Sequence, residues 1–324
     1  MIISASRRTD IPAFYAEWFI KRIRASYCAV PNPFNRNQVT RVSLLPKDVE
    51  VIVFWTRNPR PLFPYLQELD QLGFKYYFQF TVLDNPREID PKSPPVQAGI
   101  RAFQDLAQRI GPERVIWRYD PIVFTEQTGT AFHREAYKRI AEAFHGATHR
   151  SVISIMDQYA KARGRMSRLP EQGYRPLNAQ ESAEAVRQLI PDLVNIAGQQ
   201  EMEIVSCAEE LDLLPYGVRP GKCVDDDYIA RVFGIEVGSK KDPSQRKECG
   251  CVVSKDIGMY DSCLFGCQYC YATQSFDLAH RHHDEHNPDS PSLVGWYEPN
   301  QASKHSTSKP KGKASQMSLF EEEA

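Results

Sequence analysis

The chain has 324 residues and a formal net charge of −1 at pH 7, with 42% hydrophobic and 25% charged residues. These values exclude a nucleic-acid binder that acts through overall positive charge, and no apolar run approaches the ~20 residues of a membrane span. Eight cysteines, in a chain whose first residues do not resemble a signal peptide, indicate a reducing compartment and metal or redox chemistry. We therefore expect a cytoplasmic protein with no membrane partner.

The hydrophobic pattern predicts six strands that alternate with helices. The strands are expected at residues 2–6, 49–55, 74–83, 114–119, 150–156 and 202–206. Helices are expected from Pro12 onward, around 62–72, and over 96–110, 131–145 and 179–198. Cys28 is expected in the core at the end of the first helix. This alternation is typical of a parallel sheet, and no glycine-rich dinucleotide fingerprint follows the first strand. We predict an α/β fold, a partial (β/α)6 TIM-like barrel over residues 1–210.

Polar residues follow most of the predicted strands. In α/β barrels the carboxyl ends of the strands line the active site, so side chains there are candidates for catalysis or binding. Asp10 and Asp120 precede or adjoin prolines, a pattern that equally suits a helix cap or a turn. The candidates are Arg7, Arg8, Asp10, Arg57, Asn58, Arg118, Asp120, Asp157, Glu209 and Glu210.

Three cysteines near the end of the chain form the most informative motif, Cys263-x3-Cys267-x2-Cys270. A 4Fe–4S cluster is normally held by four thiolates, so three in one tight loop leave one iron open to a small molecule. The alternative is a zinc knuckle or a ferredoxin-like ligand run, and zinc would need a fourth ligand from elsewhere. The motif predicts a metal site.

With Tyr269 just before its last cysteine, the motif resembles the signature of the radical S-adenosylmethionine superfamily. The resemblance implies a 4Fe–4S cluster, S-adenosyl-L-methionine on the open iron, and cleavage of that cofactor to a 5′-deoxyadenosyl radical. It also implies an electron donor such as flavodoxin or ferredoxin, and Tyr269 packed by its backbone against the adenine. With Tyr269, Arg118 and Asp157 are assigned to cofactor binding; the residues assigned to catalysis are Arg7, Asp10, Arg57, Asp120, Cys207 and Glu209.

The motif stands late in the chain. In most of that superfamily the cysteine loop follows the first barrel strand, whereas here almost the whole globular chain precedes it. This arrangement resembles a bacterial family of unknown function whose C-terminal cysteines are similar to the N-terminal cluster motif of the radical enzymes. The resemblance runs from Met1 to about Ala279 and implies no substrate. Residues 211–297 are then a cysteine-rich iron–sulfur region that closes the mouth of the barrel.

Four further cysteines, Cys207, Cys223, Cys249 and Cys251, lie outside the motif. Four thiolates are enough for a second iron–sulfur cluster or a structural zinc. Their irregular spacing also fits a set of buried free thiols. Cys207 ends a predicted strand, where a thiol would be placed to donate a hydrogen atom to a substrate radical.

Residues 298–324 differ in character from the rest of the chain. Residues 301–315 are polar and basic, and they predict a disordered, flexible linker. The segment Gln316-Met-Ser-Leu-Phe320 resembles the peptide with which bacterial polymerases and repair proteins bind the DNA sliding clamp. The resemblance implies contacts through Gln316, Met317, Leu319 and Phe320. The alternative is that the apolar side chains fold back onto the barrel.

Together these features predict a radical S-adenosylmethionine enzyme that acts on DNA, in repair or modification, tethered to the replication clamp. Phosphate contacts would come from Arg7, Arg8, Arg36, Arg41 and Arg57. Two alternatives remain open: radical modification of RNA, a peptide or a small metabolite, and a metal-cluster binding module without turnover.

Overall fold

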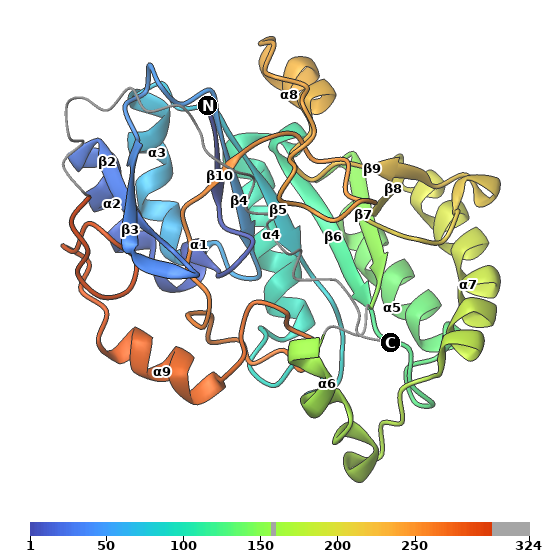
Figure 1. Cartoon of the computed structure of the whole chain (residues 1–324). Coiled ribbons are helices and arrows are strands. Elements are labelled where there is room, and N and C mark those ends of the chain that lie inside the picture. Colours follow the sequence, from blue (N-terminus) through green and yellow to red (C-terminus); the bar gives the residue numbers. More distant parts are fainter. Residues whose placement is uncertain (157–159, 300–324) are drawn as a thin grey trace, which may run out of the picture.

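The chain folds into an open parallel β-sheet. The computed structural model describes residues 1–156 and 160–299. The sheet contains eight strands: β1 (Ile2–Ala5), β4 (Val51–Thr56), β5 (Tyr76–Thr81), β6 (Val115–Ile122), β7 (Arg150–Ile155), β8 (Glu203–Cys207), β9 (Arg219–Gly221) and β10 (Lys255–Asp256). They lie in the order β10-β1-β4-β5-β6-β7-β8-β9, and every neighbouring pair is parallel. Within the described ranges no pairing joins β10 to β9, so the sheet does not close into a barrel (Figure 1).

Both faces of the sheet are buried, and alternate side chains serve the two faces. Ile52 and Phe54 of β4 point to a core that the helices complete, whereas Val51 and Val53 point to a second core formed with residues 208–252. The helices are α1 (Ile11–Phe14), α2 (Ala16–Ala25), α3 (Phe63–Gln71), α4 (Val96–Ile110), α5 (Thr130–Ala143), α6 (Ala160–Met166), α7 (Ala179–Gln199), α8 (Asp226–Phe233) and α9 (Phe276–Asp284). No helix in residues 1–156 and 160–299 is long and apolar enough to cross a membrane.

The predicted α/β class and its six strands are confirmed, and those strands are adjacent in chain order within the sheet. An antiparallel hairpin, β2 (Tyr27–Asn32) and β3 (Asn35–Ser43), was not predicted. Most of β3 is polar and exposed, so it lacks the hydrophobic alternation that marks a strand. Cys28 is buried as expected, but it lies on β2 and not at a helix end.

Because the strands are parallel, their carboxyl ends meet at one edge of the sheet. Arg7 follows β1, Arg57 follows β4, Asp120 lies near the end of β6 and Cys207 ends β8. In Figure 1, α6 and α9 lie toward the same end of the molecule. We call this end the carboxyl edge, and the cysteine motif folds against it.

His133 of α5 fixes the strand that carries Arg118. The ring is fully buried; its Nε2 donates to the carbonyl of Val123 at 3.1 Å, which leaves Nδ1 to accept from the Tyr119 hydroxyl at 2.8 Å. Burial disfavours the charged ring and lowers the pKa of His133 to about 4.

His133 therefore makes the fold sensitive to acid. The unfolded chain binds a proton at a pKa near 6.5 and the folded chain only near 4, so stability is full above pH 6.5 and falls as the pH drops toward 4. The loss from this group should reach about 3 kcal/mol at pH 4, at ~1.36 kcal/mol per pKa unit. Urea unfolding of wild-type protein and of His133→Gln between pH 4 and pH 7.5 measures this loss of stability. If the free energy of unfolding fell equally for both proteins as the pH is lowered, the His133 ring would not be held neutral in the folded state.

Candidate functional site

Most of the predicted site residues gather in two groups at the carboxyl edge. The first group surrounds the cysteine motif, which we call the cysteine loop (residues 263–270); its members are Asp10, Arg57, Cys263, Cys267, Tyr269 and Cys270. The second group surrounds the four other cysteines, which we call the thiol quartet; its members are Arg7, Arg118, Cys207, Cys223, Cys249 and Cys251. Asp157 lies outside the described residues, as does the segment Gln316–Phe320.

The base of the cysteine loop is closed by Asp261. Its backbone N–H donates to the carbonyl of Ala272 at 3.0 Å, and its carboxylate accepts from the backbone N–H groups of Gln274 and Ser275. These bonds bring the two ends of the loop together, so that the three cysteines face one region. Gly266 within the loop adopts a φ of +71°, a conformation that side chains disfavour.

Two other parts of the chain hold the cysteine loop from outside. The segment after β5 pairs with it through backbone bonds from Lys92 to Phe265 and from Gln268 to Ile89. From α6, the Arg165 guanidinium donates to the carbonyls of Gln268, Cys270 and Gln274. Neither anchor was predicted, because a loop's backbone bonds leave no pattern in the sequence.

A buried ion pair connects the loop to β4. Arg57 lies 3.4 Å from the carboxylate of Asp90 and donates to Ser93 at 2.8 Å and to the Tyr269 hydroxyl. Tyr269 in turn donates to Asp90 at 2.9 Å, and Asn85 donates to the same carboxylate. Burial alone would lower the pKa of Arg57, but the charges of Asp90 and Cys267 outweigh it and hold that pKa well above its usual value. Arg57 is therefore a permanent cation beside the loop sulfurs.

Asp10 also contacts Arg57, through the Arg57 backbone. One carboxylate oxygen caps α1 by accepting from Ala13 at 2.9 Å, and the other accepts from the backbone N–H of Arg57 at 2.6 Å. Burial raises the pKa of Asp10 to about 7. Asp10 therefore caps a helix, as its position in the sequence suggested. The same carboxylate joins the end of β4 to the N-terminal segment.

Cys267 is buried, Cys263 and Cys270 are half-buried, and the three thiols interact electrostatically with one another. Burial raises the pKa of Cys263 to about 12 and that of Cys267 well above its usual value, while the Arg57 charge partly opposes the second shift. Four thiolates on one zinc ion would lie ~3.8 Å apart, given Zn–S bonds of about 2.3 Å. Within the described part of the chain the three sulfurs do not form a group whose ligand atoms all lie within 4.8 Å. The thiol quartet, in the same described part, forms no such group either, so this criterion does not separate a single ion from a cluster at either place.

A cavity of about 90 Å³ opens beside Cys263. Its lining includes Phe276, Lys92 and His280. The Lys92 Nζ and His280 Nε2 atoms are 2.6 Å apart.

The thiol quartet lies on the face of the sheet opposite the main helices. The sulfurs of Cys207 and Cys223 are 3.2 Å apart, and the Cys251 sulfur accepts from the backbone N–H groups of Cys223 and Val224 at 3.2 and 3.4 Å. Arg118 of β6 donates to the Cys223 sulfur at 2.8 Å. Hydrogen bonds among the thiols lower the pKa of Cys207 and Cys251 and raise that of Cys223 and Cys249.

Buried side chains of β5 fix the backbone of the quartet. The Tyr77 hydroxyl and the Gln79 amide both donate to the carbonyl of Cys223, at 2.6 and 2.9 Å. The sequence identified neither residue, because each stands inside a hydrophobic strand and not after it.

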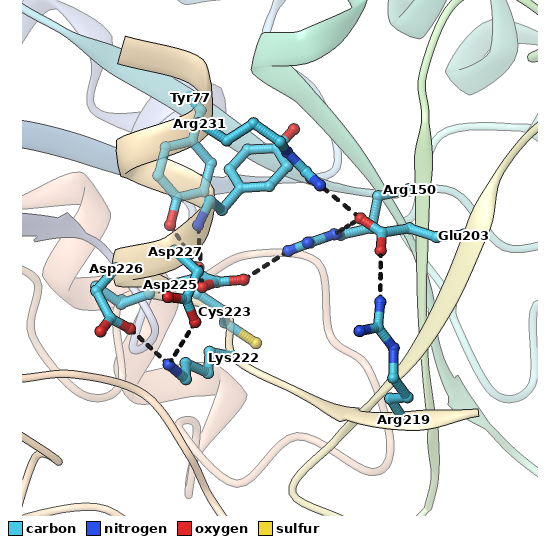
Figure 2. Close-up of polar contacts among 12 residues, drawn as sticks. Tyr77, Arg150, Glu203, Arg219, Lys222, Cys223, Asp225, Asp226, Asp227 and Arg231 are labelled. Atoms are coloured by element: carbon cyan, nitrogen blue, oxygen red, sulfur yellow. Dashed lines mark hydrogen bonds and ion pairs between the residues drawn. The ribbon is translucent and has the colours of Figure 1, made fainter. Parts of the chain in front are cut away.

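An ion-pair network holds the start of α8 beside the quartet (Figure 2). Arg150 of β7 bridges Glu203 at 2.6 Å and Asp225 at 2.7 Å. Asp225, Asp226 and Asp227 cluster closely, but Arg150 and Lys222 already compensate their charges. This network places the Cys223 segment.

Two predicted catalytic residues, Asp120 and Glu209, contact the ends of β6 and β7. Asp120 accepts from Arg118 and from Ser154 of β7, and the Glu209 carboxylate accepts from the backbone N–H of Ile155 at 2.7 Å.

Arg7, the remaining member of the quartet group, has its guanidinium 5.1 Å from the Trp55 ring centroid and donates to Ser254. Its Nη2 is buried and has no hydrogen-bond partner among the described residues.

Asp256 of β10 is a central residue that the sequence did not reveal. Its carboxylate accepts from Ser4, Ser6 and the backbone N–H of Arg7 at 2.7–2.8 Å, and it pairs with Arg8 at 3.1 Å. Burial would raise the pKa of Asp256, but Arg8 and these donors outweigh it and lower it.

The comparisons with known proteins give one match. A family model described as "Domain of unknown function (DUF1848)" matches residues 2–272. Searches of curated proteins and of solved structures found no match.

The Tyr269 hydroxyl should contribute measurably to stability, because it satisfies two buried charged groups. Tyr269→Phe leaves Arg57 and Asp90 each without one partner and should lower the free energy of unfolding by about 1–3 kcal/mol. Tyr271→Phe is the matched control: that side chain is exposed and its hydroxyl donates to the carbonyl of Arg7 at 2.8 Å, so the loss should stay within about 0.5 kcal/mol. Equal losses for the two variants in urea unfolding would contradict the buried network.

Proposed function

The chain belongs to the DUF1848 family, whose description names no activity; from the cysteine motif and the geometry of the cysteine loop we propose that it is a radical S-adenosylmethionine enzyme. The observation that carries the proposal is the cysteine loop itself. Cys263, Cys267 and Cys270 meet at the carboxyl edge of a parallel sheet, near enough to interact electrostatically. Three thiolates from one loop support an iron–sulfur cluster with one iron left open.

The chain's own residues would prepare the site in three ways. Cys263, Cys267 and Cys270 would hold the cluster, and the group would supply an electron that cleaves S-adenosylmethionine to a 5′-deoxyadenosyl radical. Arg57 keeps a positive charge beside the thiolates, which favours their ionised form. Tyr269, Asp90 and Arg165 hold the loop in place, and the apolar side chains around it exclude water.

The remaining candidates keep roles that follow from their positions. Asp120, linked to Arg118 and Ser154, and Glu209, linked to the end of β7, lie at the carboxyl edge, where a substrate would meet the sheet. Cys207 ends β8 at the same edge, so its thiol, when no metal holds it, is a candidate hydrogen-atom donor. Arg118 stays a candidate for cofactor binding, and its side chain contacts Cys223, Gln79 and Asp120.

A DNA substrate is supported by the hairpin β2–β3 as well as by the tail. Residues 27–43 contain Arg36 and Arg41 and no acidic residue, and Phe34 at the tip is 74% exposed. An exposed aromatic ring at the tip of a hairpin that carries cationic side chains suits stacking on a base with contacts to phosphates. The main argument for DNA is still the clamp-like segment Gln316–Phe320, which rests on the sequence alone.

Removing the loop thiols tests the chemistry. After anaerobic reconstitution with iron and sulfide, wild-type protein with dithionite and S-adenosylmethionine should release 5′-deoxyadenosine. The triple variant C263A/C267A/C270A should release none, because its loop cannot hold a cluster, while its circular dichroism should match wild type. Cys28→Ala is the control, since Cys28 belongs to the helix-side core and should keep the activity. Product from the triple variant, or none from iron-loaded wild-type protein, would contradict the proposal.

The tail tests the substrate class. A peptide of residues 315–324 should bind a bacterial sliding clamp with a micromolar dissociation constant, about −8 kcal/mol, as a short motif with a few buried anchors does. In the full chain, L319A/F320A should abolish clamp binding and leave the melting temperature unchanged. A large fall in the melting temperature would instead mean that these side chains are part of the fold, and DNA would lose its main support.

A further inference from the structure

We propose that the thiol quartet is a second metal centre, in which Cys207, Cys223, Cys249 and Cys251 hold a thiophilic metal through four thiolates. This inference does not depend on radical chemistry at the cysteine loop. The argument begins from the convergence of residues far apart in the sequence. Cys207 ends β8, Cys223 follows β9, and Cys249 and Cys251 belong to the segment that returns across the sheet toward β10. Chance burial does not explain why all four meet in one small core.

The sulfur geometry fits metal ligands better than other uses of cysteine. The Cys207 and Cys223 sulfurs are 3.2 Å apart, far beyond the about 2.05 Å of a disulfide bond and close to the ~3.8 Å that separates two ligands on one ion. Within residues 1–156 and 160–299 no three quartet sulfurs all lie within 4.8 Å of one another, so binding a single ion would draw them closer together. The Cys251 sulfur accepts two backbone N–H groups. Such bonds stabilise a thiolate, which is the form that binds metals.

The charges around the quartet support the same conclusion. Arg118 donates to the Cys223 sulfur, and the Arg7 guanidinium lies close enough for Cys251 and Cys223 to stabilise its charge. A buried cation needs compensation, and Arg7 Nη2 is buried with no hydrogen-bond partner among residues 1–156 and 160–299. Asp120 and Asp256 already compensate part of the charge of Arg118 and Arg7. The thiolates of a metal centre would place further negative charge beside both guanidinium groups, which neutral thiols would not.

The rest of the site is prepared in the manner of a metal centre. Tyr77 and Gln79 hold the carbonyl of Cys223, and the Arg150–Asp225 ion pair holds the residues that follow it (Figure 2). These groups fix the backbone and leave the sulfurs as the inward-facing atoms. Zinc, single iron and iron–sulfur clusters all accept four thiolates, so the ligand set defines the class and the metal is identified by experiment.

The experiment uses the full chain with C263A/C267A/C270A, which removes the loop thiols and leaves five cysteines. The anaerobically purified protein, and the same protein reconstituted with Zn²⁺ or with Fe²⁺ and sulfide, is analysed for zinc, iron and acid-labile sulfide. We expect about one bound centre per chain: zinc alone, iron alone, or iron with sulfide, each of which identifies the centre. Adding C207S/C251S should reduce the metal to near zero, whereas adding Cys28→Ser should not change it.

A second measurement does not require the quartet to be mutated. With Cd²⁺ bound to the triple variant, thiolate-to-metal charge-transfer absorption should report four thiolates, and alkylation followed by mass spectrometry should find the four quartet cysteines protected. Removing the metal with a chelator should expose all four to alkylation. The proposal is overturned if no metal binds after reconstitution, if the quartet thiols alkylate equally with and without metal, or if C207S/C251S keeps the full metal content. Loss of 5′-deoxyadenosine formation in the triple variant bears only on the cysteine loop.

Discussion

The buried carboxylate of Asp256 connects the two ends of this fold. It accepts from Ser4, Ser6 and the backbone of Arg7, and it pairs with Arg8, so the turn after the first strand is held by a residue about 250 positions later. β10, which carries Asp256, extends the sheet beside β1 and directs the chain toward the carboxyl edge. Gly258 allows this approach, since a side chain there would overlap the Ser6 hydroxyl. Without this contact the segment that carries the cysteine loop would have no fixed path back to the sheet.

The buried charges near both sulfur groups are arranged in a similar way. Arg57 lies between Asp90 and the loop thiols, and Arg118 lies between Asp120 and the quartet. Each guanidinium has one carboxylate partner and one sulfur neighbour. Taking an arginine side chain out of water costs free energy, and one ion pair of the strength found at the protein surface would not compensate that cost. The sulfur neighbours supply the remaining negative charge most fully when they are thiolates, which links the charge state of the arginines to metal binding in both places.

The sequence was sufficient for the features that depend on local pattern. Burial on both faces makes β4, β5, β6 and β8 nearly continuous apolar runs, and the amphipathic helices between them follow the 3.6-residue period. It also predicted that polar residues after the strands would converge. It could not predict which of them would meet, because that depends on tertiary register: Arg118 contacts Cys223, 105 residues away, and Tyr269 contacts Asp90, 179 residues away. Asp256, Gln79 and Arg165 bear no local signal of the contacts that they make.

The late position of the cysteine motif has a physical reason in this arrangement. The cysteine loop does not contribute a strand to the sheet; it bonds to finished surfaces, namely the segment after β5, α6 and the end of β4. The quartet differs, since Cys207 lies in the sheet and Cys223 belongs to the second core. Loss of the loop thiols should therefore leave the sheet folded, whereas loss of the quartet removes contacts that hold residues 208–252 over an otherwise open apolar face. Because residues earlier in the sequence form every surface that the cysteine loop contacts, the loop can stand near the end of the chain.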